Sequence, residues 1–299
     1  MTLNLMGILP VLPTPFDQDG AVDISAMPQL VRFAVDAGVS GVVFPGFASE
    51  VEHLSPDERK DLLGVVVDAA AGEVPIVAGA SAETPEAVIV HGQTAQALGI
   101  DVLMIQTPKS IGNSAEAVIA FLRAVTDQLP KSQIILQNAP APRGSDLSGQ
   151  TILQVVEAIK NIVYVKEETL PAGPSITQIM EQKPAHLVGV IGGGGARYIL
   201  DEYARGACAA MPALEIADLH VALDAAWRSG DRSKARDLYV QTLPLLTLQA
   251  VFRMRLTKHT MMRRGILSNA DVRAPTAELD AFSIADIDKN LTELGILSA

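Results

Sequence analysis

One lysine of this sequence lies where a lysine is unexpected. Residues 162–166 read Ile-Val-Tyr-Val-Lys, and Glu167 and Glu168 follow directly. Long cationic side chains are seldom fully buried unless another group pairs with them or a reaction uses them. Burial lowers the pKa of an ammonium, and the resulting amine can add to a ketone and form a Schiff base. Position alone fits equally well a lysine that extends to the rim and pairs with a glutamate.

Strand geometry separates the two glutamates. Side chains alternate between the two faces of a strand, so Lys166 and Glu168 share one face and Glu167 points the other way. Tyr164 shares the face of Lys166 but lies about 7 Å deeper, which favours a packing role. We therefore take Glu168 as the acid/base candidate. The alternative is that Glu168 is only an ion-pair partner of Lys166. Burial would raise its pKa, and the Lys166 ammonium would oppose that rise.

Short apolar segments alternate with longer amphipathic ones along the first two thirds of the chain. The predicted strands cover 7–14, 41–44, 74–79, 101–107, 133–138, 162–166, 187–192 and 206–212. The predicted helices cover 25–37, 55–71, 84–98, 114–129, 148–159, 174–182 and 195–204. Eight such repeats predict parallel strands joined by helical crossovers, and hence a (β/α)8 TIM barrel over residues 1–212. A doubly wound open sheet is disfavoured because no Gly-rich phosphate loop follows the first strand.

The strand pattern ends at Pro212. Helices are predicted over 214–229, 231–251, 252–264 and 278–295, with a tight connection at 229–235. We therefore predict an all-helical C-terminal extension over residues 213–299. No linker-like segment separates it from the barrel, so we expect the extension to pack on the barrel.

In TIM barrels, functional groups lie at the carboxyl ends of the strands. The loop after the second strand contains Ala48 and Ser49, which leave room for a ligand to approach backbone N–H groups. The Ser49 hydroxyl could donate to a substrate carboxylate. The alternative is a simple turn into the helix that Ser55 caps, with Glu50 anchoring the loop.

A run of four glycines follows the seventh strand. Gly193 and Gly194 lie in this run, ahead of a predicted helix N-terminus, which is a plausible cradle for an anion. The alternative is a tight packing loop. Ala210 lies at the end of the eighth predicted strand and belongs to the same set of strand-end positions.

The composition excludes several classes of function. The net charge is −11, only 4% of residues are aromatic, and no basic face is evident, which argues against nucleic-acid binding. No apolar run is long enough for a membrane span, and the first residues do not resemble a signal peptide, so a cytoplasmic enzyme fits best. One cysteine and scattered histidines make a zinc site improbable. We expect a reaction without metal or cofactor.

Several motifs together resemble one superfamily. "LPVLPTPFDQDGAVD", the Gly46–Glu50 segment followed by "LSPDER", "NAP", the strand ending in Lys166, and "RGILSNADVRAP" are similar to the dihydrodipicolinate synthase / N-acetylneuraminate lyase superfamily. The resemblance covers about residues 5–280 of the chain. It implies a class I aldolase-type barrel, a Schiff-base lysine at Lys166 and a small-molecule 2-keto acid substrate. It also implies a homo-oligomer, a tetramer or a dimer.

The chain departs from the usual pattern of that superfamily at four places, one of which is a tyrosine pair after the fourth strand that is replaced by Lys109-Ser110. Threonines normally hold the substrate carboxylate where this chain has Phe47-Ala48-Ser49. A tyrosine proton shuttle is replaced by Gln137, whose amide does not titrate. The usual arginine position holds Pro142, with Arg143 next to it. These departures argue against dihydrodipicolinate synthase and sialic-acid lyase activities.

The 2-keto-3-deoxy-pentonate (L-2-keto-3-deoxyarabonate) dehydratases resemble this chain more closely. They lack the tyrosine and carry Lys-x-Glu, which implies that Glu168 replaces it. A second glutamate of that branch maps near Asp201-Glu202, for which a surface position is the alternative. The predicted catalytic residues are Lys166 and Glu168, and the predicted substrate contacts are Ala48, Ser49, Gln137, Gly193, Gly194, Glu202 and Ala210.

Three functions remain open. The first is a Schiff-base lyase that dehydrates a 2-keto-3-deoxy sugar acid. The second is a retro-aldol lyase that releases pyruvate through the same imine, as in dihydrodipicolinate synthase-like enzymes or keto-deoxy-sugar-acid aldolases. The third is a barrel that binds keto acids without turnover.

Overall fold

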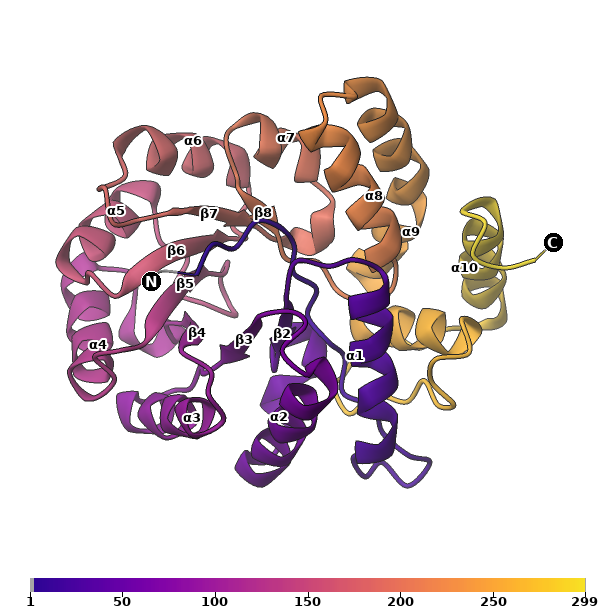
Figure 1. Ribbon diagram of the computed structural model, residues 1–299, viewed down its shortest axis with the longest axis horizontal. Helices are drawn as coiled ribbons and strands as arrows, with labels where there is room; N and C mark the ends of the chain where they lie inside the picture. The colour runs from indigo at the N-terminus through magenta and orange to yellow at the C-terminus, as the bar shows by residue number, and fades with distance from the viewer. Residues whose placement is uncertain (1–2, 299) are drawn as a thin grey trace. The chain divides into compact units, whose positions relative to one another are not determined.

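The computed structural model describes residues 3–298 and shows a (β/α)8 TIM barrel with C-terminal helices (Figure 1), as predicted. The strands form one sheet in the order β1-β8-β7-β6-β5-β4-β3-β2. Their bounds are β1 Gly7–Ile8, β2 Val42–Phe44, β3 Ile76–Gly79, β4 Val102–Gln106, β5 Gln133–Asn138, β6 Ile162–Glu167, β7 Gly189–Gly192 and β8 Ala209–Ala210. Pairing from β3 to β8 is parallel throughout.

The first and last strands are shorter than predicted. Residues 7–14 were expected to form one strand, but β1 covers only Gly7–Ile8, and Val11 forms isolated bridges to Val43 and Ala213. Pro10 and Pro13 flank Val11 and lack the N–H that a continuous ladder needs. Pro212 limits the last strand in the same way.

The helices between the strands agree with the predictions to within a few residues. They are α1 Met27–Asp36, α2 Pro56–Ala70, α3 Pro85–Ala97, α4 Ala115–Gln128, α5 Gly149–Ala158, α6 Ala172–Gln182 and α7 Ile199–Ala204. Ser55 accepts from the Glu58 N–H and Glu58 reaches back to Ser55, which is the predicted capping box. Helix α7 begins later than predicted because Gly194, Gly195 and Ala196 all have positive φ.

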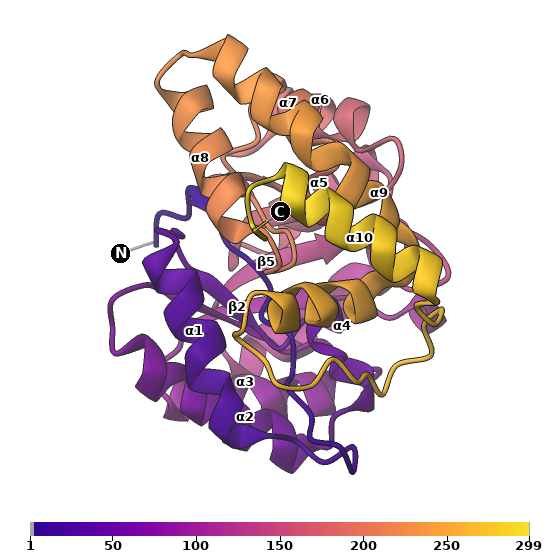
Figure 2. The ribbon, with the colours of Figure 1, turned by 90° about the vertical axis from the view of Figure 1, so that its right-hand side faces the viewer.

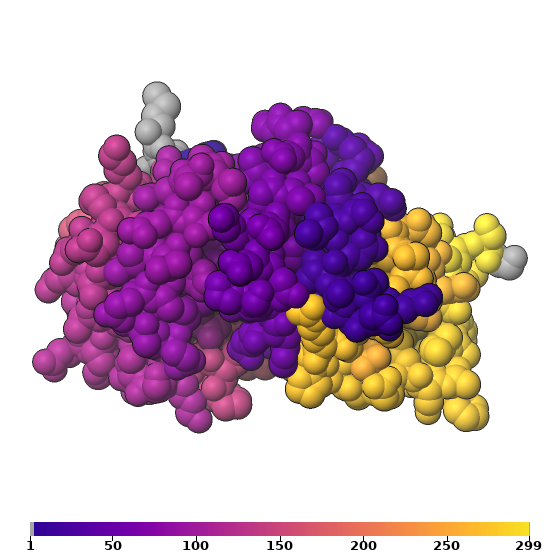
Figure 3. Space-filling model, turned by 90° about the horizontal axis from the view of Figure 1, so that it is seen from below, coloured from indigo at the N-terminus to yellow at the C-terminus, as the bar shows by residue number. Residues whose placement is uncertain are grey.

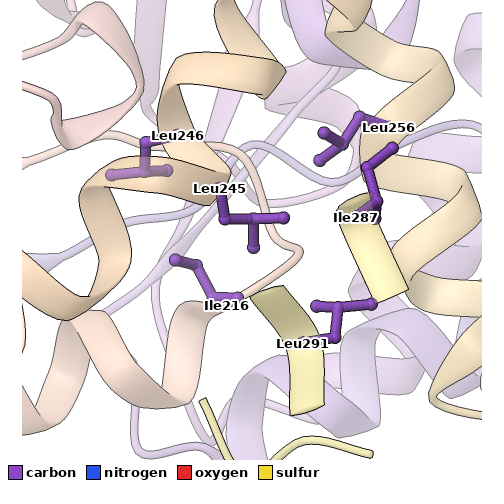
Figure 4. Close-up of a cluster of buried hydrophobic side chains, with 6 residues drawn as sticks. All are labelled: Ile216, Leu245, Leu246, Leu256, Ile287 and Leu291. Carbon is purple, nitrogen blue, oxygen red and sulfur yellow. The ribbon is translucent and has the colours of Figure 1, made fainter. Parts of the chain in front are cut away.

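The C-terminal helices are α8 Ala217–Arg228, α9 Arg232–Arg263 and α10 Ala281–Glu293. Arg253 has φ 53° and ψ −128°, so α9 is interrupted where two helices were predicted to meet. Helix α10 packs against α9 (Figure 2). Their shared core contains six buried side chains (Figure 4): Ile216, Leu245, Leu246, Leu256, Ile287 and Leu291. Among the described residues, no helix is long and apolar enough to cross a membrane.

The chain divides into two compact units. The first comprises Met1–Met6, Ile76–Gly194 and Tyr198–Ala210, and the second Gly7–Pro75, Gly195–Arg197 and Met211–Ala299. In the first, α3 to α6 line the outer side of β3 to β7 (Figure 1). In the second, N-terminal and C-terminal residues lie side by side (Figure 3), and the Asn269 amide donates to the Phe16 and Asp17 carbonyls. The predicted domain division at residue 212 stays a prediction.

Candidate active site

Lys166 and Glu168 are in contact in the first unit. Every residue of β6 is buried, and the Lys166 side chain is 4% exposed. Its Nζ lies 3.0 Å from Oε1 of Glu168, as expected for side chains that share a strand face. Burial lowers the pKa of Lys166, and the Glu168 charge opposes this without cancelling it. The lysine is therefore closer to its neutral, nucleophilic form than an exposed lysine would be.

Glu168 is a stabilised carboxylate. Its Oε2 accepts from Nε2 of Gln137 at 2.7 Å and from Nη2 of Arg143 at 2.9 Å. Burial raises the pKa of Glu168, but the charges of Lys166 and Arg143 and the Gln137 amide outweigh it and lower the pKa to about 2. The expectation that partial burial could give Glu168 a raised pKa is therefore wrong for the free protein. Three donors converge on one carboxylate, and two of them are cations.

Glu167 lies on the opposite face and has a packing role. Its carboxylate accepts from the Asn138 amide, from the backbone N–H and hydroxyl of Thr169, and from the hydroxyl of Ser175 on α6. Tyr164 also serves the fold, because its hydroxyl accepts from the Leu5 N–H at 2.8 Å and donates to the Leu3 carbonyl at 3.1 Å. The alternation of β6 thus gives adjacent residues different roles.

A second carboxyl group lies near this pair. Glu202, on α7, is 1% exposed, so the surface alternative for this residue is wrong. Burial raises the pKa of Glu202 to about 8; a hydrogen bond from the Gly193 N–H opposes this rise, and the Glu168 charge adds to it. Its Oε2 has no hydrogen-bond partner among residues 3–298. Glu202 is therefore a neutral acid at pH 7, beside an ionised Glu168.

The glycine run provides the space that these carboxyl groups occupy. A Cβ on Gly192 would collide with Oε2 of Glu202, and a Cβ on Gly193 would collide with Cγ of Glu168. Gly194 has φ 57°, a conformation that favours glycine. Ala210 is buried at the end of β8, in register with Gly192. The predicted packing role of this loop is thus evident, and the role of Gly193, Gly194 and Ala210 as substrate contacts stays a prediction.

Ala48 and Ser49 belong to the second unit, in a short 3-10 turn over Phe47–Ser49. The Ser49 side chain is fully buried, donates to the Leu12 carbonyl and accepts from the Gly46 N–H at 2.9 Å. Its one hydroxyl proton is therefore already bonded to the Leu12 carbonyl, outside the turn. A substrate contact by Ser49 would have to replace that bond, and for both residues this contact stays a prediction.

The second unit contains another buried lysine–glutamate pair, which the sequence did not reveal. Nζ of Lys258 lies 2.6 Å from Oε1 of Glu50, and both side chains are fully buried. Oε2 of Glu50 accepts from the backbone N–H groups of Arg273 and Ala274, each at 2.7 Å. Nζ of Lys258 also donates to the Asp271 carbonyl. Burial lowers the pKa of Lys258 to about 8.

Arg143 contacts Glu168, but sequence reasoning did not assign it to the site. It follows Pro142 in a loop, where no periodicity indicates the direction of a side chain. Only its position next to the usual arginine of the superfamily hinted at a role. Across the described residues, no group of three or more His, Cys, Asp and Glu side chains is arranged to hold a metal ion.

Comparisons with known proteins identify the family of this chain. The model of the dihydrodipicolinate synthetase family matches residues 4–294. The 4-hydroxy-tetrahydrodipicolinate synthase of Agrobacterium fabrum is 29% identical over 98% of this chain and 99% of its own, and that of Pelodictyon phaeoclathratiforme is 28% identical over 99% of each.

Solved structures show the same fold. A dihydrodipicolinate synthase from Rhodopseudomonas palustris superposes with a TM-score of 0.89 at 24% identity, covering 98% of this chain and 100% of that one. The synthase from Thermotoga maritima gives 0.89 at 20% identity, covering 98% and 99%. The family match spans nearly the whole chain, and the chain therefore belongs to the dihydrodipicolinate synthetase family.

Proposed function

We propose that this protein is a Schiff-base lyase that removes water from a 2-keto-3-deoxy sugar acid. The observation that carries the proposal is the contact of Lys166 with Glu168 in a site where Gln137 offers no titratable group. Family membership supports the imine chemistry. The pair of carboxyl groups with opposite pKa shifts supports the dehydration.

The first step uses the amine of Lys166. Its Nζ adds to the C2 carbonyl of the substrate, and loss of the carbonyl oxygen as water leaves a protonated imine. Burial favours this step because it lowers the pKa of Lys166. The neighbouring Glu168 can accept the proton that the ammonium must lose before it attacks.

The second step removes a proton from C3. The imine cation acidifies that proton, Glu168 takes it, and the C–H electron pair forms the C2–C3 double bond of a neutral enamine. The positive charge on the lysine nitrogen disappears in the same step. Because that charge holds the pKa of Glu168 low in the free protein, its loss makes the protonated glutamic acid more stable.

The third step breaks the bond between C4 and its hydroxyl. The enamine electrons move to form a C3–C4 double bond, and the departing oxygen takes a proton and leaves as water. Glu202 can supply this proton because burial keeps it neutral near pH 7, and protonated Glu168 is the other source. Hydrolysis of the imine then releases an unsaturated keto acid and restores Lys166.

Retro-aldol cleavage is the second candidate, and the names of the relatives favour it. Both curated relatives above are named 4-hydroxy-tetrahydrodipicolinate synthase, an activity that forms a carbon–carbon bond. The same imine serves both reactions, which differ in whether C4–O or C3–C4 breaks. A barrel that binds keto acids without turnover is the non-enzymatic alternative.

We also propose a homo-oligomer, which analytical ultracentrifugation tests.

Product analysis decides among these functions. The protein is incubated with 2-oxo-4,5-dihydroxypentanoate, and the products are separated and identified. The proposal predicts the unsaturated keto acid 5-hydroxy-2-oxopent-3-enoate or its isomer, the semialdehyde, which forms when a C5 proton and the hydroxyl proton leave and C3 and C4 each gain a proton. Retro-aldol cleavage gives pyruvate and an aldehyde instead. The Lys166→Met variant is the control and should form neither product. Binding without any product, for each 2-keto acid tried, would contradict both enzymatic readings.

A further inference from the structure

We infer that the buried Lys258–Glu50 pair positions the turn at Phe47–Ser49, and that it thereby sets how tightly the protein binds the carboxylate of a 2-keto acid. This inference rests on the proposed function and on the predicted substrate contacts of Ala48 and Ser49. It makes Lys258 and Glu50 positioning residues, which act on binding through the turn and not on the reacting atoms.

Glu50 has a backbone conformation that residues other than glycine seldom adopt. Its φ is 59° and its ψ is 39°, in the left-handed region. Its N–H donates to the Phe47 carbonyl at 3.0 Å, and its own carbonyl accepts from the His53 N–H at 2.8 Å. Glu50 therefore joins two consecutive 3-10 turns, Phe47–Ser49 and Val51–His53. A residue stays in such a conformation only where the surrounding contacts hold it.

The side chain of Glu50 supplies such contacts. Its Oε1 forms an ion pair with Nζ of Lys258 at 2.6 Å, and its Oε2 accepts from the N–H groups of Arg273 and Ala274, each at 2.7 Å. Nζ of Lys258 also donates to the Asp271 carbonyl at 2.7 Å. All of these groups belong to the second unit. A rotation of the Glu50 backbone out of the left-handed region would disturb several of these contacts at once.

The segment 269–274 supplies the backbone partners of this pair and is itself anchored at several points. The Asn269 amide donates to the Phe16 carbonyl at 3.1 Å. The Arg273 guanidinium lies 2.8 Å from the Glu58 carboxylate, and Glu58 also forms the capping box of α2. The pair therefore meets partners that are themselves held in place, and it can pass this constraint on to the turn.

Stability alone is a poor reason for burying this pair, because apolar side chains of similar size often stabilise a core as well or better. The location of the pair indicates a different reason. Glu50 lies in the loop after β2, and in TIM barrels the loops at the carboxyl ends of the strands form the binding site. A displacement of about 1 Å in a site can weaken function by about 10²-fold, even when the altered residue lies far from the chemistry.

Two double variants separate the ion pair from the backbone conformation of Glu50. Lys258→Met/Glu50→Ala and Lys258→Met/Glu50→Gly both remove the pair, and neither leaves an unpaired buried charge. They differ because glycine adopts the left-handed conformation freely and alanine does not. Ile287→Ala is the matched control, since Ile287 is fully buried in a core of the same unit that includes no residue of the turn. Its truncation lowers stability through a cavity.

Titration calorimetry gives the Kd of pyruvate for each protein. Lys258→Met/Glu50→Ala should bind pyruvate about tenfold or more weakly than the wild type. Lys258→Met/Glu50→Gly should bind it about fivefold more tightly than the alanine form, because alanine disfavours the left-handed conformation by about that factor. Ile287→Ala should keep the Kd of the wild type.

A ketone without a carboxylate provides a second readout. Borohydride should trap hydroxyacetone on Lys166 at the same rate in all four proteins, because this ketone has no group for the turn to bind. A merely structural role of the Lys258–Glu50 pair would not separate the two ligands, since general damage to the protein would weaken both.

The inference fails if the alanine form binds pyruvate as tightly as the wild type, if the two double variants bind it equally weakly, or if Ile287→Ala weakens binding to the same extent. A wild type that binds no pyruvate contradicts it as well. If the double variants do not fold, Arg273→Met decides, because the Arg273 side chain is only partly buried, at 25% exposed, and its loss leaves the backbone bonds to Glu50 in place. The Kd of pyruvate should rise in this variant, and an unchanged Kd contradicts the inference.

Failure of the proposed function looks different. The wild type would then bind pyruvate but form no dehydration product from 2-oxo-4,5-dihydroxypentanoate.

Discussion

The chain contains two buried lysine–glutamate pairs, and their surroundings differ. In the Lys258–Glu50 pair, the further hydrogen bonds of the charged atoms within residues 3–298 go to main chain: two N–H groups for Glu50 and one carbonyl for Lys258. Nζ of Lys258 also lies 3.9 Å from the centre of the Phe16 ring. In the Lys166–Glu168 pair, the further partners are the side chains of Gln137 and Arg143. Backbone partners hold a pair in one geometry, whereas side-chain partners can rearrange when a ligand arrives.

The comparison shows that a buried ion pair and a lowered lysine pKa do not by themselves identify a catalytic site. Burial lowers the pKa of both Lys166 and Lys258. Structural ion pairs perturb pKa values as catalytic groups do. What distinguishes Lys166 is its place at the end of a barrel strand, with Glu202 and its unpartnered oxygen nearby.

Removal of Lys166 should have the largest effect on activity. In Lys166→Met, kcat should fall by at least about 10⁴-fold, because no amine remains to form the imine. Stability should change little, since Glu168 keeps Arg143 and Gln137 as partners. Dehydration assays and urea unfolding check both statements. Substantial residual turnover would contradict the role of Lys166.

Removal of the Glu168 charge should have a smaller but still large effect. In Glu168→Gln, kcat should fall by about 10²–10⁴-fold, because proton transfer is lost while the amine remains. Imine formation, followed by borohydride reduction, should persist. Glu167→Gln is the matched neighbour. It should lower stability and leave kcat per folded molecule nearly unchanged, because Glu167 binds Asn138, Thr169 and Ser175.

Substitutions in the Lys258–Glu50 pair should change the stability of the protein. Lys258→Met leaves Glu50 without its charged partner and should lower the free energy of unfolding by about 3–5 kcal/mol. The double variant Lys258→Met/Glu50→Gln should recover part of this loss. Urea unfolding gives the values. If Lys258→Met instead abolished imine formation in folded protein, the contrast between the two pairs would be wrong.

The pH dependence of stability should be the smallest effect, and the two regions should give opposite slopes. Folding raises the pKa of Glu202 from its usual 4.5 to about 8, so its contribution is complete below pH 4.5 and is lost as the pH rises through 8. Relative to Glu202→Gln, the wild type should lose stability as the pH rises from 5 to 8, and the difference should level off above pH 8. Folding lowers the pKa of Lys258 from 10.5 to about 8, which adds stability as the pH rises above 8. Urea unfolding of Glu202→Gln and Lys258→Met across this range separates the slopes.

Local patterns in the sequence were enough to predict part of the site. The alternation along β6 separated Glu168 from Glu167 because both lie on one short strand with a period of two. The eight repeats of strand and helix predicted the barrel because each repeat is also a local pattern in the sequence. The helical phase of Glu202 was uncertain because α7 begins only after three residues with positive φ, which the sequence does not reveal.

The remaining contacts depend on distant parts of the chain. Arg143 reaches Glu168 from a loop whose path is set by Gln106 and Ser145. Lys258 lies in α9, and Glu50 lies in a loop that is far from it in the sequence. No local pattern around either residue indicates that their side chains are in contact. The short β1, in contrast, could have been predicted from local sequence. Pro10 and Pro13 lack the backbone N–H that a continuous strand needs, and both are visible in the sequence.

Borohydride reduction in the presence of pyruvate tests the central claim most directly. The protein is reduced with the keto acid present, digested, and analysed by peptide mass spectrometry. The account predicts that the peptide containing Lys166 gains the mass of the reduced adduct, and that the peptide containing Lys258 keeps its mass although both lysines are buried. An unchanged Lys166 peptide, or an adduct on Lys258 in its place, would contradict the account.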